Sequence, residues 1–197
     1  MRTFSSIVIA IVTLAIIACV RAQNGKFSYV IHSAPAIDIK SIDITPIPIL
    51  HPGEAFLTFE ADLKRPINTI ATALKIVRTV SGIKLPVNCY KVEGLDVGSC
   101  NYTDLCVVLK TMLPSFKPET CPAAMAIYGI DCNCPFKIPA GKLNIIQEKL
   151  VLPDAKQSIA SFMATGDFAI RLDTSDPQGP YAALTVNFSV KPKPSAG

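Results

Sequence analysis

The chain has 197 residues, of which 50% are hydrophobic and 17% charged, against about 25% charged residues in ordinary soluble domains. Its formal net charge is +4, and removal of an N-terminal segment that carries Arg2 and Arg21 leaves +2. Such a weak charge does not favour nucleic acid as a partner. The apolar composition indicates either a well-filled core or apolar surface that lines a cavity or an exposed patch.

Residues 1–22 are predicted to be a signal peptide. Arg2 supplies the basic start, Ile7 to Ile17 supply the apolar core, and Ala22 is the small residue at the cut. This apolar run is too short for a membrane-spanning helix. A rival cut before Cys19 would follow the bacterial lipoprotein pattern, but two glycosylation sequons suit a eukaryotic secretory route. We therefore expect export from the cytosol.

The mature chain is expected to form one domain. Residues 23–190 have the length of a single domain, and residues 191–197 are predicted to be a flexible tail because they are rich in proline and lysine.

Alternation of apolar and polar residues predicts antiparallel strands with one solvated face. In the first such segment the alternation slips at Lys40–Ser41, which is consistent with a β-bulge. The five segments are Ile37–Ile44, Glu54–Leu63, Thr69–Val80, Asp167–Asp173 and Ala182–Val190.

One helix is predicted from Tyr102 to Leu113. Thr103 is a candidate N-cap, the apolar residues that follow have helical spacing, and Pro114 ends the segment.

Six cysteines within one stretch indicate a disulfide framework, because an even number in an exported domain is oxidised. Spacing alone leaves fifteen pairings open. Zinc is the competing interpretation of the Cys132-Asn133-Cys134 pair, but no second close pair exists and His32 and His51 lie far upstream. No metal or cofactor is therefore expected. The six residues are Cys89, Cys100, Cys106, Cys121, Cys132 and Cys134; Cys19 leaves with the signal peptide.

No catalytic motif accompanies the two histidines. Neither a Gly-x-Ser-x-Gly nor a His-Glu-x-x-His sequence is present, so we do not expect an enzyme. The sequons Asn101-Tyr102-Thr103 and Asn187-Phe188-Ser189 predict glycosylation at Asn101 and Asn187.

The segments around the cysteines resemble the GM-two ganglioside activator family. Weaker similarity runs from about Ile37 to Val190. The resemblance implies a mostly β, single-domain antiparallel β-cup with a central apolar cavity and one short helix in a disulfide-linked region; the alternation alone is equally compatible with a sandwich or a barrel. The matching pieces are Gly98-Ser99-Cys100, Asp104-Leu105-Cys106 through Leu113-Pro114, Cys121-Pro122, Tyr128-Gly129 and Cys132-Asn133-Cys134-Pro135-Phe136.

The resemblance also selects the disulfide pairs Cys89–Cys100, Cys106–Cys134 and Cys121–Cys132. A fourth bridge that is usual in the family is absent, since no cysteine stands near Ile31 or Ala182.

Alternation gives the side chains that we expect to point into the lipid cavity. A slip of one residue would reverse every face. The candidates are Leu57, Phe59, Leu74, Ile76, Phe168, Ile170, Leu172, Val186 and Phe188.

The cavity rim and membrane-contact loop are placed by resemblance at Ile83, Ile159, Phe162 and Met163. The family has a tryptophan at the position of Phe162, whereas this chain has none. Because tryptophan suits a membrane interface better than phenylalanine, its loss implies either weaker membrane contact or a different lipid.

The family resemblance implies a secreted, extracellular or lysosomal lipid-binding protein that is not an enzyme. Such a protein makes transient contact with a membrane surface, extracts a ganglioside and presents it to a soluble β-hexosaminidase. The alternatives are a secreted carrier of lipids or small apolar molecules with no enzyme partner, and a disulfide-stabilised binding or defence protein with a filled core. A large dry cavity favours either lipid hypothesis.

Overall fold

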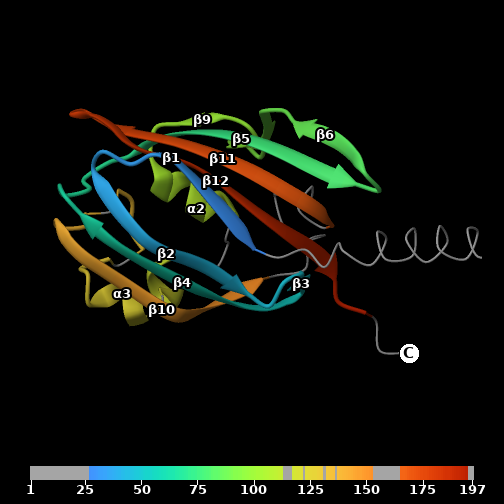
Figure 1. Cartoon of the computed structure of the whole chain (residues 1–197), viewed down its shortest axis with the longest axis horizontal. Coiled ribbons are helices and arrows are strands. Elements are labelled where there is room, and N and C mark those ends of the chain that lie inside the picture. The colour runs from blue at the N-terminus through green and yellow to red at the C-terminus, as the bar shows by residue number, and fades with distance from the viewer. Residues whose placement is uncertain are drawn as a thin grey trace, which may run out of the picture.

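Two antiparallel β-sheets, one above the other in Figure 1, make up most of the protein. The computed structural model describes residues 27–112, 117–121, 123–130, 132–135, 137–152 and 165–194. The predicted signal peptide and the predicted rim residues Ile159, Phe162 and Met163 lie outside these ranges.

The larger sheet forms the upper layer in Figure 1. Its main path consists of five antiparallel strands, in the order β1 (Ser28–Ser33), β12 (Gly179–Pro192), β11 (Gly166–Asp176), β5 (Ala71–Val80) and β6 (Ile83–Val87). Two short strands join it at the sides: β3 (Ile49–His51) pairs with β12 in parallel, and β9 (Asn101–Tyr102) pairs with β5.

The smaller sheet forms the lower layer. Its strands are β10 (Gly141–Leu152), β4 (Gly53–Leu63) and β2 (Ile37–Thr45), in that order. The register of β2 shifts between Ile39 and Ser41, which confirms the bulge predicted there. A separate hairpin consists of β7 (Tyr90–Val92) and β8 (Leu95–Val97).

The helical part of the described chain lies among the cysteines. It consists of α2 (Leu105–Met112), one 3-10 turn (Pro118–Thr120) and the short α3 (Ala123–Ala126). The prediction of Thr103 as N-cap was wrong: the helix begins at Leu105, and the Asp104 carboxylate accepts a 2.7 Å hydrogen bond from the Cys106 backbone N–H. Tyr102, predicted to start the helix, belongs instead to β9.

Three disulfides connect the region around α2 and α3. They are Cys89–Cys100, Cys106–Cys134 and Cys121–Cys132, the pairs implied by the resemblance, with Cα atoms 4.8, 5.5 and 5.6 Å apart. Cys106 and Cys132 are fully buried beside Ile130. The second and third bridges therefore hold the helical segments against one another.

The expected fold class is confirmed: the protein is mostly β, antiparallel and open, with the short helix α2 in the disulfide-linked region. Strand pairing continues into the predicted tail, because Lys191 and Pro192 pair with β3 and the Lys193 N–H donates to the His51 carbonyl at 2.9 Å. Among the helices that the structure describes, none is long and apolar enough to cross a membrane.

Candidate functional site

An apolar cavity of about 230 Å³ lies between the two sheets, at the end of the molecule that carries α2 and α3. Both sheets, α2 and the segment from 125 to 138 contribute to its wall. The lining residues are Ile37, Ile39, Ile42, Phe59, Leu63, Ile67, Ile70, Leu105, Leu109, Met125, Ile130, Ile138, Leu143, Ile145, Thr174, Tyr181, Ala182 and Leu184.

The larger sheet contributes both small and large side chains to the cavity wall. Thr174 of β11 and Ala182 of β12 are paired, and both line the space beside Tyr181 and Leu184. Ala182 and Tyr181 also belong to a buried cluster that includes Leu63 and Ile145 of the smaller sheet. The segment that carries Met125 closes one side, since the Tyr128 hydroxyl makes 2.7 Å hydrogen bonds with both the carbonyl and the N–H of Asn144 at the edge of β10.

The polar groups of the cavity wall are already bonded within the protein. The Thr174 hydroxyl donates to the Ala182 carbonyl at 2.7 Å and accepts from the Ala182 N–H at 3.0 Å. The Tyr181 hydroxyl donates to the Arg65 carbonyl at 3.0 Å. Burial raises the pKa of Tyr181, so this residue stays neutral. The wall therefore offers a ligand hydrocarbon contacts.

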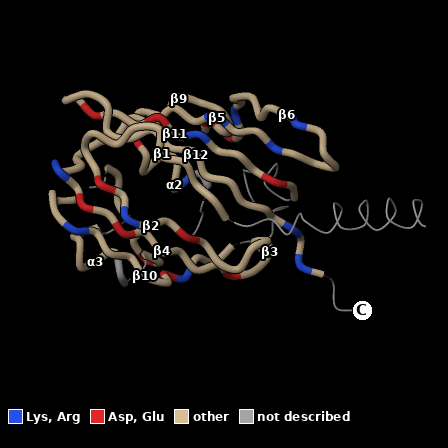
Figure 2. The backbone as a smooth tube through the Cα atoms, viewed as in Figure 1, with Lys and Arg blue, Asp and Glu red and all other residues tan. Residues whose placement is uncertain are grey.

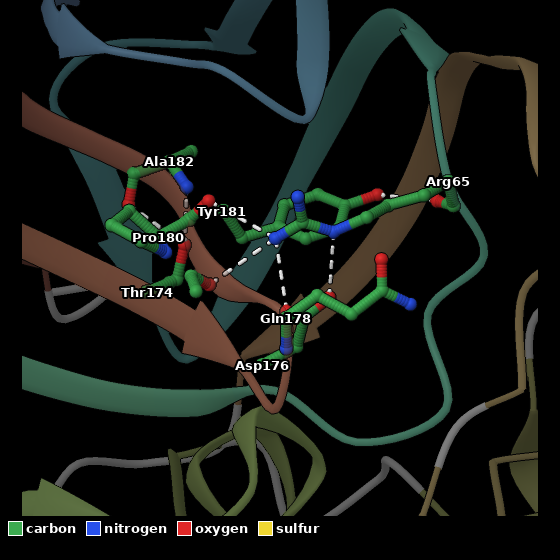
Figure 3. Close-up of polar contacts among 8 residues, drawn as sticks. Arg65, Thr174, Asp176, Gln178, Pro180, Tyr181 and Ala182 are labelled. Atoms are coloured by element: carbon green, nitrogen blue, oxygen red, sulfur yellow. Dashed lines mark hydrogen bonds and ion pairs between the residues drawn. The ribbon is translucent and has the colours of Figure 1, made fainter.

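A cluster centred on Arg65 supports Tyr181 from outside the cavity (Figure 3). The guanidinium donates to both carboxylate oxygens of Asp176, from Nε at 2.8 Å and from Nη2 at 2.9 Å, and also to the carbonyls of Gly179 and Pro180. Its central carbon lies 5.2 Å from the centre of the Tyr181 ring. The hydrogen bonds from Arg65 hold the pKa of Asp176 below its usual value.

Of the predicted cavity residues, Phe59 lines this cavity and the other eight do not. Their predicted role in binding lipid therefore remains a prediction. Ile76, Phe168, Ile170 and Phe188 pack with Ile49, Ala55 and Val190; Leu74 and Leu172 pack with Cys100, Tyr102 and Val108; Leu57 and Val186 are half-buried strand residues.

Most of the lining residues were missed because they lie outside the strands that alternation identifies. Leu105 and Leu109 follow the helical spacing of α2, which is a signal that a sequence reader can use. Ile67 and Ile138 lie outside the strands and form an isolated bridge, and Met125 lies in the four-residue α3, so none of the three belongs to a segment long enough to show a periodic pattern.

The surface residues singled out from the sequence lie apart from the cavity. Ile83, a predicted rim residue, begins β6 and is 63% exposed. Figure 2 shows charged residues along the strands of both sheets. The smaller sheet carries the exposed ion pairs Lys40–Asp38 and Lys149–Glu54. Within the described parts of the chain, no three His, Cys, Asp or Glu residues come together as metal ligands.

The two sequon asparagines lie on one face of the larger sheet. Residues that pair across neighbouring strands point to the same face of a sheet. Asn101 pairs with Ala73, Ala73 with Asp173, and Asp173 with Ala183. Asn187 lies four residues after Ala183 in β12 and points to the same side. Asn101 is exposed and Asn187 is half-buried. Glycosylation at both positions remains a prediction.

The fold and the site together define an open antiparallel β-cup with an internal apolar cavity. The chain is 31% identical to the ganglioside GM2 activator of Mus musculus over 138 residues, covering 70% of this chain and 66% of that protein. It is 30% identical to the ganglioside GM2 activator of Macaca fascicularis over 139 residues, covering 69% and 66%. The chain belongs to the ganglioside GM2 activator family.

The matched region spans 66% of the length of each relative. Both relatives are named as activators and not as enzymes, in agreement with the expectation that the chain is not catalytic. The crystal structure of a Niemann-Pick type C2 protein from Japanese carpenter ant aligns at 8% identity with a TM-score of 0.38, covering 83% of this chain and 99% of that chain. No protein-family model matches the chain.

Proposed function

We propose that this protein binds the acyl chains of a glycosphingolipid in its apolar cavity, extracts the lipid from a membrane and presents its headgroup to a soluble glycosidase such as a β-hexosaminidase. The observation that carries the first part is the cavity, whose polar groups Thr174 and Tyr181 are bonded within the protein. A sugar or a charged headgroup would find no partner there, whereas hydrocarbon would.

The energetics favour acyl chains as the occupant. Each methylene group removed from water contributes about 0.8 kcal/mol, so a lipid leaves a bilayer only for another apolar site. A volume of about 230 Å³ accepts a segment of hydrocarbon and leaves the headgroup outside. Ganglioside is the lipid in the names of the two relatives. The glycosidase is what the sequence resemblance implies.

Transient contact with a membrane belongs to this proposal. Ile83 and Leu85 of β6 are 63% and 46% exposed, and Lys84 lies between them. Exposed apolar side chains beside a lysine suit a surface where lipid tails and headgroups meet. Secretion and a lysosomal or extracellular destination follow from the predicted signal peptide and remain part of the proposal.

Mass spectrometry of lipids that co-purify with the secreted protein tests the binding step. We expect glycosphingolipid to be recovered from the wild-type protein and to be lost when Ala182→Phe fills the cavity. A matched control is Ala183→Phe, because Ala183 is the neighbouring residue on the opposite face of β12 and does not line the cavity. Equal lipid recovery from the two variants would argue against this cavity as the binding site.

The presentation step needs its own assay. Purified protein is added to ganglioside and β-hexosaminidase without detergent, and release of the terminal sugar is measured. We expect stimulation that saturates as protein is added. Lipid binding without stimulation would favour the alternative, a secreted lipid carrier with no enzyme partner.

A further inference from the structure

Tyr181 lies where three segments of the chain meet in the cavity wall. It lies near the start of β12, and its hydroxyl donates to the backbone carbonyl of Arg65 in the loop after β4. Its own carbonyl accepts the Ala36 N–H at 3.3 Å from the turn between β1 and β2. The residue is 2% exposed, and it lines the cavity. Its ring is therefore held on several sides.

The support for this ring stands outside the cavity. Arg65 and Asp176 are not lining residues, and their side chains are 22% and 7% exposed. The guanidinium is fixed by two hydrogen bonds to Asp176 and two to backbone carbonyls, and the Gln178 N–H donates to Asp176 at 2.8 Å. A charge-assisted double hydrogen bond of this kind sets direction as well as attraction.

We propose that Tyr181 is the wall that limits the length of the hydrocarbon chain the cavity accepts, and that Arg65 and Asp176 are positioning residues for it. This inference rests on the proposed function, in which the cavity binds acyl chains. A chain gains about fourfold in affinity for each methylene group that it buries. That gain stops where the chain meets a side chain that is held in place.

A homologous series of alkyl maltosides, each below its critical micelle concentration, measures the limit. These probes carry one hydrocarbon chain and a sugar that stays outside. Isothermal titration calorimetry on the wild-type protein should show affinity rising about fourfold per methylene and then levelling off at one chain length.

Tyr181→Leu should move this levelling-off point to longer chains, because leucine leaves free the space that the ring occupies. Tyr102→Leu is the matched control: Tyr102 is 6% exposed, its hydroxyl donates to the Gly98 carbonyl, and it does not line the cavity. Tyr181→Phe keeps the ring and should keep the wild-type limit. If Tyr181→Leu does not fold, Tyr181→Trp decides, since a larger ring should shift the limit to shorter chains.

The positioning role is tested separately. Arg65→Gln should raise the affinity for chains longer than the wild-type limit, because the ring then loses the guanidinium contact, although its hydroxyl still bonds to the carbonyl of residue 65. Arg171→Gln is the control, since Arg171 makes a comparable double contact with Asp173 away from the cavity. The same chain-length profile for both variants would overturn the role assigned to Arg65.

The outcomes separate this inference from the function on which it rests. The wild-type protein could bind the series without any chain-length limit, or with a limit that Tyr181→Leu does not move. Either result would overturn the role of Tyr181 as the wall and leave lipid binding in the cavity intact. A wild-type protein that binds no member of the series would overturn lipid binding in this cavity, and the wall with it.

Discussion

The two halves of the space between the sheets differ in how they are filled. At one end Phe168 of β11 and Phe188 of β12 stack with ring centres 5.7 Å apart, and Ile49, Ala55 and Ile76 complete a packed cluster. At the other end Tyr181 and Ala182 of β12 belong to a buried cluster with residues of the smaller sheet, and this cluster borders the cavity. One pair of strands thus supplies both a core and a binding cavity.

This difference shows that one pair of strands can border both a space that side chains fill and a space that they leave open. Protein interiors pack densely, so an unfilled space loses dispersion contacts and lowers stability. Buried clusters at both ends stabilise the fold, and the end that contains the cavity also keeps space for a ligand. We refer to these two parts as the packed half and the hollow half.

The largest difference is expected between two phenylalanine substitutions. Phe168→Ala in the packed half should lower the free energy of unfolding by about 3–5 kcal/mol, since Phe168 is 2% exposed and leaves a new cavity. Phe59→Ala should cost about 1–2 kcal/mol, because the half-buried Phe59 already borders open space. Urea denaturation measures both, and equal losses would show that the halves do not differ energetically.

A second comparison uses two disulfides that each join cysteines 11 residues apart. Changing both cysteines of either bridge to serine should cost about 2–4 kcal/mol. Loss of Cys121–Cys132 should also weaken alkyl maltoside binding, because Met125 and Ile130 of the cavity wall lie inside that loop. Loss of Cys89–Cys100 should leave alkyl maltoside binding unchanged. Weakened binding in both variants would contradict the conclusion that only the Cys121–Cys132 loop belongs to the cavity wall.

A smaller effect is expected from acid. The pKa of Asp176 is lowered in the folded protein by its hydrogen bonds with Arg65, so the stabilisation is complete at pH values well above about 3.9 and is lost as the pH falls through the folded pKa. Asp176→Asn should therefore destabilise the protein at neutral pH and flatten the loss of stability in strong acid. Thermal midpoints measured across this pH range give the result.

A matched variant sharpens the acid experiment. Asp173→Asn removes the partner of Arg171, an ion pair that is more exposed to solvent than Arg65–Asp176. Because solvent screens exposed pairs, its effect on the pH dependence should be the smaller of the two. A larger effect of Asp173→Asn than of Asp176→Asn would show that the Arg65–Asp176 pair is not the stronger of the two ion pairs.

The smallest change in stability is expected at Ile83. Ile83→Ser should alter the free energy of unfolding by less than about 0.5 kcal/mol, since the side chain is 63% exposed. It should nevertheless weaken sedimentation with anionic vesicles. Val30→Ser, at a valine that is 53% exposed on β1, is the control and should leave vesicle binding unchanged.

Local alternation predicted which strand residues face inward. Leu74, Ile76 and Phe168 are all buried, as their parity along β5 and β11 indicated. Alternation does not report the distance to the opposite sheet or the size of the side chain found there. The sequence could therefore identify Phe168 and Ala182 as inward positions. It could not show that Phe168 fills a core and that Ala182 borders a cavity.

Strand β10 was not predicted, for a physical reason. Leu143 and Ile145 alternate with polar residues, but the register then shifts between Ile145 and Glu148. The bulge changes which residues face inward, so the second half of the strand no longer continues the pattern of the first. The cavity wall that β10 supplies was missed for the same reason.

The hydrogen bonds of Tyr128 with Asn144 also affect how separate molecules meet. β10 is the last strand of its sheet, and an unprotected last strand invites another chain to add to it and to start aggregation. The tyrosine hydroxyl satisfies both backbone groups of Asn144, so an incoming strand finds no donor or acceptor there. One side chain that fastens a cavity wall thereby also blocks strand addition at this position of the edge.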